Sequence, residues 1–136
     1  MKKILLVCMV FTTLSLAEGY TQGDRILDMQ KMAQAMQDIQ SGFFYNNLDI
    51  VIAGSTDLKA AIINVGPTQA EKNNKDVYER WMNNNTAMTA RTQKRISKYA
   101  DTLVERFKDG DAVQALQIYN RVNAECLKCH ISLRKW

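Results

Sequence analysis

The stretch Cys126-Leu127-Lys128-Cys129-His130, near the carboxyl end of the chain, brings three reactive side chains into one short register. Two thiols three positions apart lie on one turn of a helix, where each can add to one vinyl group of a haem. The imidazole that follows then lies under the iron as its proximal ligand. His130 is the single histidine of the chain. The pattern therefore predicts one covalently attached haem per chain, with His130 holding the iron.

Three other interpretations of this pattern account for less of it. A dithiol redox pair usually follows a strand in a βαβ pattern, and the sequence indicates no such strand. A zinc site needs four ligands, more than two thiols and one imidazole provide. A structural disulfide leaves the neighbouring His130 without a role.

The first 17 residues have the pattern of a secretory signal peptide. Lys2 and Lys3 precede an apolar run that is too short to span a bilayer comfortably, and the run ends in small residues at Ala17. Cys8 lies inside this run without the small residues before it that a lipoprotein cysteine needs. We therefore expect cleavage after Ala17, with residues 18–136 forming one periplasmic domain that does not insert stably into a membrane.

The charge of the chain indicates no polyanionic partner. The formal net charge is +4, and the loss of Lys2 and Lys3 with the signal peptide leaves +2. Two ionised haem propionates would bring the total near zero, so we expect no nucleic acid partner. Four basic residues of one predicted helix are interpreted as a solvated face, or alternatively as a docking patch for an acidic redox partner: Arg91, Lys94, Arg95 and Lys98.

The composition predicts an all-α fold of four helices. One proline, six glycines and the absence of strand-like alternation favour helix. The first helix is expected to begin with Asp24 as its N-cap and to end near Tyr45, or alternatively to continue to Gly54. The second carries an apolar seam over residues 48–65 and closes at Gly66-Pro67.

A polar loop at residues 68–76 should precede a third helix at residues 77–108, whose apolar stripe begins at Trp81. Gly110 ends this helix and Asp111 caps the fourth, which runs to about Arg134. The predicted inner face of the fourth helix contains the haem motif: Ala112, Leu116, Tyr119, Val122, Cys126, His130 and Leu133. The porphyrin would therefore be wedged among the helices, where burial controls the potential of the iron and access to it.

The carboxyl-terminal half resembles cytochrome c′ and its low-spin relatives, the class II c-type cytochromes. The segment 107–111 (Phe-Lys-Asp-Gly-Asp) looks like the turn before the last helix of that family, and the sixteen-position spacing from Gly110 to Cys126 is similar. The segment 126–134 is similar to the family ending C-x-x-C-H-x-x-Y-R, with Leu133 in place of the tyrosine and Arg134 matching.

Trp81 also stands about where that family has a tryptophan opening its third helix. The resemblance implies an antiparallel four-helix bundle with covalent haem near the end of the last helix. The end of the last helix would then lie beside the start of the first.

This arrangement implies that a residue of the first helix faces the iron opposite His130. Low-spin relatives place a methionine there, whereas five-coordinate members usually have an apolar residue that is not a ligand. Family members often have an arginine four residues before this position, near a propionate, and Arg25 precedes Met29 by four. We predict Met29 as the sixth ligand. Two other methionines on the same face, or no methionine at all, are left open: Met32 and Met36, the latter favoured if the helix continues to Gly54.

These features predict a periplasmic monohaem electron-transfer protein rather than an enzyme, because the chain has no second histidine for general base catalysis. Its partners would be other redox proteins. Arg25 and Arg134 are expected either to neutralise the propionates or to be exposed helix arginines. The alternative is a five-coordinate cytochrome c′-type protein that binds nitric oxide or carbon monoxide in a pocket lined by methionine, Ile39 and Phe43. Homodimerisation, common in the family, is left open.

Overall fold

The computed structural model describes residues 19–84 and 86–134; the predicted signal peptide and the side chain of Arg134 lie outside the described residues. The helices are α1 (Gln22–Tyr45), α2 (Leu48–Ile62), α3 (Gln69–Lys72), α4 (Val77–Asn84), α5 (Thr86–Lys108) and α6 (Ala112–Arg134). No strand occurs in these two ranges. The expectation of an all-α fold is therefore confirmed.

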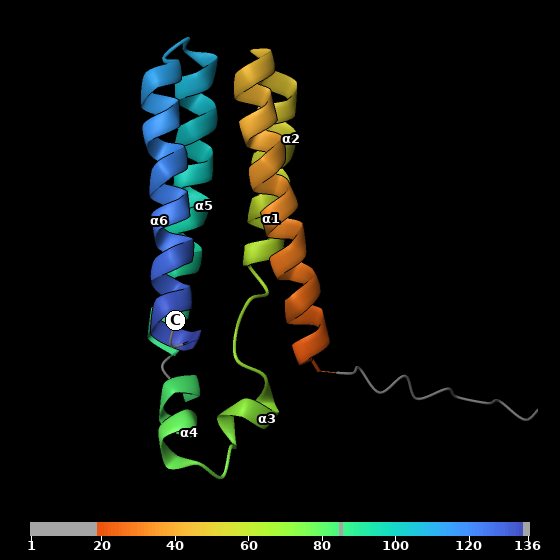
Figure 1. Cartoon of the computed structure of the whole chain (residues 1–136), viewed down its shortest axis with the longest axis vertical. Coiled ribbons are helices and arrows are strands. Elements are labelled where there is room, and N and C mark those ends of the chain that lie inside the picture. Colours follow the sequence, from red (N-terminus) through yellow and green to blue (C-terminus); the bar gives the residue numbers. More distant parts are fainter. Residues whose placement is uncertain (1–18, 85, 135–136) are drawn as a thin grey trace, which may run out of the picture.

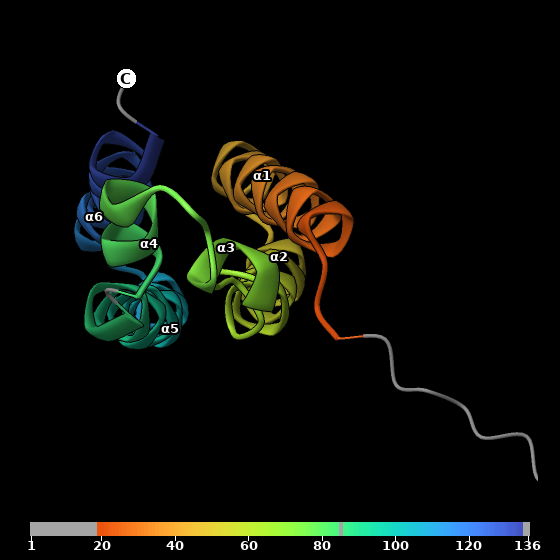
Figure 2. The same ribbon diagram turned by 90° about the horizontal axis from the view of Figure 1, so that it is seen from below.

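The long helices α1, α2, α5 and α6 lie side by side, and each runs opposite to the long helix before it in the chain (Figure 1). The backbones of α1 and α2, of α5 and α6, and of α2 and α5 pack closely, whereas α1 and α6 make no comparably extensive approach. Figure 2 shows the resulting two pairs, α1 with α2 and α5 with α6.

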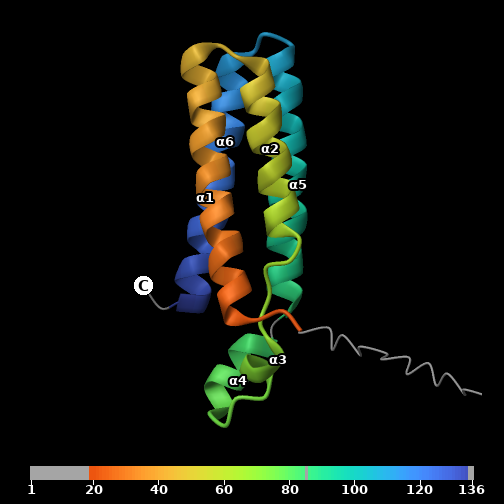
Figure 3. The same ribbon diagram turned by 90° about the vertical axis from the view of Figure 1, so that its right-hand side faces the viewer.

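The start of α1 and the end of α6 lie at the same end of this arrangement, termed here the cysteine end (Figure 3). The opposite end, where α1 turns into α2 and α5 into α6, is termed the turn end. The helices α3 and α4 lie beyond the cysteine end. The relation between the first and last helices that the resemblance implied is thus present.

Thr21, rather than Asp24, is the N-cap of α1. The Thr21 hydroxyl accepts a hydrogen bond from the Asp24 N–H at 3.2 Å, and the Asp24 carboxylate accepts one from the Thr21 N–H at 2.8 Å. This reciprocal pair is a capping box, in which the acidic residue occupies the third helical position. The prediction of Asp24 as the cap was wrong, because threonine and aspartate both cap helices and here they form a capping box with threonine as the N-cap.

The turn between α1 and α2 is made by Asn46 and Asn47. Asn46 has a φ of 48°, a left-handed conformation that ends α1. The side-chain oxygen of Asn47 then accepts hydrogen bonds from the N–H groups of Asp49 and Ile50 and caps α2. The expected end of the first helix near Tyr45 is confirmed, and the alternative of one helix continuing to Gly54 is wrong.

The predicted helix over residues 77–108 is described as α4 and α5, with Asn85 between them outside the described residues. The α4 helix buries no residue, and Trp81 is 62% exposed. Trp81 therefore does not begin a buried stripe, contrary to the prediction. The expected polar loop contains the one-turn helix α3, which Thr68 and Glu71 cap in a second capping box.

The core lies between the two helix pairs, and its largest fully buried side chains are Ile39, Val51, Leu58, Ile96, Leu103 and Val122. In α6 the buried residues include Ala115, Ile118 and Val122, whereas Ala112 and Leu116 are exposed. The predicted inner face was therefore wrong in the first turns of α6, where Ala115 is buried in place of Ala112 and Leu116. The face is correct at Val122 and at the half-buried Tyr119 and Cys126.

Aromatic rings close the turn end. The Phe43 ring lies edge-on to Phe107 and Tyr119, with centroid distances of 5.1 and 6.0 Å. The Tyr119 hydroxyl donates to the Met36 carbonyl at 3.3 Å. Edge-to-face pairs of this kind stabilise by about 0.5–1.5 kcal/mol beyond their buried area. The two helix pairs are thus fastened together where α1 and α5 end.

Candidate haem-attachment site

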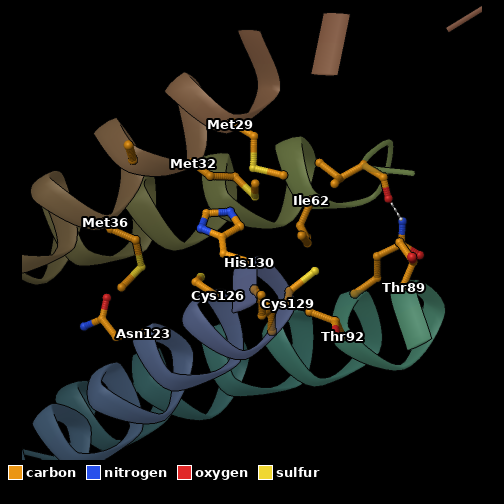
Figure 4. A pocket seen from close by; sticks show the side chains of 14 residues that line it. Met29, Met32, Met36, Ile62, Thr89, Thr92, Asn123, Cys126, Cys129 and His130 are labelled. Carbon is orange, nitrogen blue, oxygen red and sulfur yellow. Dashed lines mark hydrogen bonds between the residues drawn. The ribbon is translucent and has the colours of Figure 1, made fainter. Parts of the chain in front are cut away.

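A cavity of about 220 Å³ lies between the four long helices near the cysteine end. Its walls include the three motif residues of α6, which are Cys126, Cys129 and His130. Figure 4 shows these side chains facing the methionines of α1 across the cavity. All three methionines that the sequence singled out line it: Met29, Met32 and Met36. The structure therefore brings the predicted attachment residues and every predicted candidate ligand to one place.

The two cysteines of the motif are half-buried and do not form a disulfide with each other. Their spacing of three residues on α6 turns both toward the same cavity. Burial, assisted by the charge of Cys129, raises the pKa of the Cys126 thiol to about 11. The surroundings therefore favour an uncharged sulfur, and a thioether, the product of thiol addition to a vinyl group, is uncharged.

The His130 ring projects from α6 toward α1, where Met29 and Met32 lie closest to it in Figure 4. Met36 lies farther along α1, beside Asn123. Met32 and Met36 are core residues, 7% and 9% exposed, whereas Met29 is only partly buried.

A second cavity of about 200 Å³ adjoins the first and shares Met29, Cys129 and His130 with it. Met32 and Met36 line only the first of these two cavities. Of the three candidate methionines, Met29 is therefore the one that lines both cavities, as His130 does. The case for Met36 also depended on a first helix continuing to Gly54, which does not occur.

Arg25 lies in the wall of the second cavity, on the same helix as Met29. It is 7% exposed, and its guanidinium donates to both carboxylate oxygens of Glu71 and to the Gly66 carbonyl at 3.2 Å. Its Nε is buried and has no hydrogen-bond partner among the described residues. Arg25 therefore shares a cavity wall with Cys129 and His130, and its charge is bound by Glu71. The alternative that it is an exposed helix arginine is wrong, and its role at a propionate stays a prediction.

Hydrogen bonds from Arg25 and, secondarily, from the Thr68 N–H hold the pKa of Glu71 down at about 2. Glu71 is thus a permanent anion in the wall of the second cavity at neutral pH. Arg134, the other predicted propionate partner, ends α6 at the cysteine end, and its side chain lies outside the described residues.

The sequence analysis missed several residues of the two cavities: Glu71, Met82, Thr89 and Thr92. Thr89 and Thr92 are each 8% exposed and share one face of α5 with Ile96. Their three- and four-residue spacing with Ile96 was an available signal. Glu71 had a signal too, because Thr68-x-x-Glu71 is a capping-box pattern.

Ile39 and Phe43, predicted to line an apolar distal pocket, line neither cavity. Ile39 is fully buried in the core, and Phe43 packs against the aromatic rings of the turn end. The apolar wall is instead supplied by Ile62 and Val65 and by Ile96 of α5. The prediction failed because Ile39 and Phe43 lie farther along α1, toward the turn end, than the cavities do.

Within residues 19–84 and 86–134, no three His, Cys, Asp or Glu side chains gather into a site for a bare metal ion. No helix in the same ranges combines the length and hydropathy needed to cross a bilayer. Comparison with protein-family models, curated proteins and solved structures finds no match to this chain.

The residues present fit a covalently bound haem on three observations. Both cysteines line one cavity, and so does His130, the residue after Cys129. The wall opposite them carries thioether sulfurs and aliphatic carbon, which suit a porphyrin face. A cavity wall includes a buried arginine whose Nε lacks a partner among the described residues, and it could donate to a carboxylate.

Proposed function

We propose that this chain is a periplasmic class II c-type cytochrome that transfers electrons. Cys126 and Cys129 would hold haem c through two thioether bonds, and His130 would be the proximal iron ligand. Met29 of α1 would be the sixth ligand, and the four long helices would form an antiparallel four-helix bundle. The observation that carries the proposal is that the motif and Met29 line one cavity between α6 and α1.

The bound haem would supply one-electron chemistry, its iron alternating between Fe(III) and Fe(II). The residues of the chain set how easily this happens. A thioether ligand from Met29 favours Fe(II) and raises the potential relative to a second imidazole. Aliphatic side chains such as Ile62, Val65 and Ile96 keep water from the ring, which also disfavours the more highly charged ferric state.

The proposal is tested by expressing the full chain in a host that matures c-type cytochromes and recording optical spectra of the purified protein. We expect a Soret band that stays with the polypeptide after acid–acetone extraction, and low-spin spectra in both oxidation states. Cys126→Ser/Cys129→Ser should lose the covalent haem, whereas Cys8→Ser, in the predicted signal peptide, should keep it in the exported protein.

Two outcomes would contradict the proposal at different levels. An exported protein with two titratable thiols and no Soret band would exclude haem attachment altogether. A covalent haem with high-spin spectra and prompt carbon monoxide binding would exclude methionine ligation. The second result would favour the five-coordinate alternative, a protein that binds nitric oxide or carbon monoxide.

A further inference from the structure

The cysteine-end half of the α5–α6 pair carries a one-sided surplus of positive charge. Residues 86–100 and 121–134 contain a single carboxylate, Glu125, which pairs with Arg95 at 3.0 Å. Five other exposed basic residues in these segments form no ion pair among the described residues: Arg91, Lys94, Lys98, Arg121 and Lys128. This half of the pair is therefore strongly cationic.

The surplus is local. The α1–α2 pair carries more acid than base, with Asp24, Asp28, Asp38, Asp49 and Asp57 against Arg25, Lys31 and Lys59. At the turn end, carboxylates accompany the basic residues of α5: Asp101, Glu105, Asp109 and Asp111. Although the net charge of the predicted mature chain is only +2, positive charge is concentrated on the cysteine-end half of the α5–α6 pair and negative charge on the α1–α2 pair.

The cationic half contains a pocket of about 180 Å³ between α5 and α6. We define the basic groove by its three cationic lining residues, Arg91, Arg95 and Lys128. The same pocket is lined by Cys129 and Thr92, which also line the cavity that contains Cys126 and His130, termed here the attachment cavity. Cys129 therefore forms part of the wall between the attachment cavity and the basic groove.

We propose that the basic groove is the docking site for an acidic redox protein, and that electrons cross the protein surface beside Cys129. This inference rests on the proposed function. When the protein acts as the electron donor, its haem iron would be oxidised from Fe(II) to Fe(III) and the partner would be reduced by the same one electron. Arg95 is paired with Glu125, which also lines the groove, whereas Arg91 and Lys128 form no ion pair among the described residues. These two cations attract an acidic surface, guide its approach and orient it over this edge.

Docking through this groove should depend strongly on salt, because the Debye length falls to about 8 Å at physiological ionic strength. The interaction would then be fast and transient, as a carrier requires. Long-lived binding through an apolar interface would not suit a protein that must release each partner.

The first test measures surface charge without using the haem. We compare Arg91→Gln/Lys128→Gln with the control Arg106→Gln/Lys108→Gln, whose exposed residues lie at the turn end of α5. Both variants lose one arginine and one lysine. On a carboxymethyl resin the groove variant should elute at clearly lower salt than the control variant. Equal elution of the two would show that only net charge matters and would overturn the proposal.

The second test measures electron exchange with a carboxylate surface. Haem-loaded protein is adsorbed on gold coated with a carboxylate-terminated monolayer and studied by voltammetry at low salt. We expect the groove variant to exchange electrons at least about tenfold more slowly than the control variant. An unchanged rate would overturn the proposal.

Two further outcomes, binding of anionic lipid and absence of haem, can be told apart from the proposed docking. If the groove variant lost binding to phosphatidylglycerol vesicles but kept its exchange rate on the carboxylate surface, the groove would serve anionic lipid and the docking proposal would fail. If the protein carried no Soret band, the proposed function would fail first, and the resin comparison would still report the local charge.

Discussion

The guanidinium of Arg25 on α1 binds both carboxylate oxygens of Glu71 on α3, although the two residues are 46 positions apart. The same guanidinium donates to the Gly66 carbonyl, and Glu71 accepts from the Thr68 N–H. One ion pair thus fastens the segment after α2 to the start of α1. Both residues of the pair line a cavity that His130 also lines, so the pair holds part of the wall of the candidate attachment site in place.

Glu71→Gln should destabilise the protein because it leaves the guanidinium of Arg25, with a side chain only 8% exposed, without its counter-charge. We expect a loss of about 2–3 kcal/mol in the free energy of unfolding at pH 7. Urea denaturation followed by circular dichroism measures it. The control is Asp101→Asn, which removes the exposed pair with Lys59 and should cost less than about 1 kcal/mol. Equal costs for the two variants would contradict the assigned role of the buried pair.

The same pair predicts a specific dependence on pH. The pKa of Glu71 is about 2 in the folded protein and 4.5 in a model peptide, so the folded state prefers the ionised carboxylate. Its stabilising contribution is complete above pH 4.5 and is lost as the pH falls toward 2, by about 2–3 kcal/mol. The wild-type protein should therefore lose more stability than Glu71→Gln between pH 6 and pH 2. Parallel stability curves over this range would exclude the linkage.

Methionine ligation can be assigned by comparing Met29→Ala with Met36→Ala. Met29 lines both cavities beside His130, whereas Met36 lines only the first and lies beside Asn123. We expect Met29→Ala to convert the ferrous spectrum to high spin and to allow carbon monoxide to bind at once. Met36→Ala should keep the low-spin spectrum and lower stability by about 2–5 kcal/mol as a core truncation. A low-spin Met29→Ala protein would move the assignment to Met32 or Met36.

Gly54 allows α2 to approach α1 closely. A Cβ at this position would lie 2.8 Å from the Ala35 carbonyl oxygen and 3.0 Å from the Ile39 nitrogen, both of which are backbone atoms. Gly54→Ala should therefore cost about 1–3 kcal/mol. Gly23→Ala, where the nearest atom is the Thr21 hydroxyl at 3.5 Å, should instead stabilise by up to about 1 kcal/mol. Thermal denaturation of both variants checks the opposite signs, and a shift of the same sign in both would be inconsistent with the close approach.

Cys126 should react slowly with alkylating reagents before haem is attached. Its pKa is raised from 9.0 to about 11 by burial, so the thiolate fraction at pH 8 falls about 100-fold. We expect iodoacetamide to modify Cys126 in cytoplasmically expressed, haem-free protein far more slowly than in the same protein unfolded in urea. Mass spectrometry of the modified peptides gives both rates. Similar rates in the two states would show that the thiol is not buried as described.

The turn between α5 and α6 was predictable, because two residues decide it. Gly110 has a φ of 79°, and Asp111 caps α6 by accepting from the Gln114 N–H, as the residue types predicted. The placement of Cys126, Cys129 and His130 on the last helix was also predictable, whereas the attachment of haem to them stays a prediction. The position of this motif opposite the α1 methionines was expected from the antiparallel bundle that the resemblance implied.

The errors came from side chains whose surroundings are not local in sequence. Leu116 was assigned to the inner face of the last helix, but the packing of α6 buries Ala115 instead. Trp81 was assigned to a buried stripe, yet α4 lies beyond the long helices and exposes it. Glu71 belonged to a polar loop in sequence, and only the fold brings it to Arg25. Periodicity predicts which residues share a face but not which neighbour that face meets.

The aromatic contacts of Phe43 with Phe107 and Tyr119 join the two helix pairs at the end remote from the cysteines. At the other end, α1 and α6 make no similarly close backbone approach. Nearer the cysteine end, the two pairs are joined by the side-chain amide of Gln93 on α5, which donates to the Ile63 and Val65 carbonyls just after α2. If haem is attached as proposed, a flat ring that enters between α1 and α6 would disturb the backbone packing of the long helices least, because the three closely packed helix pairs would stay together.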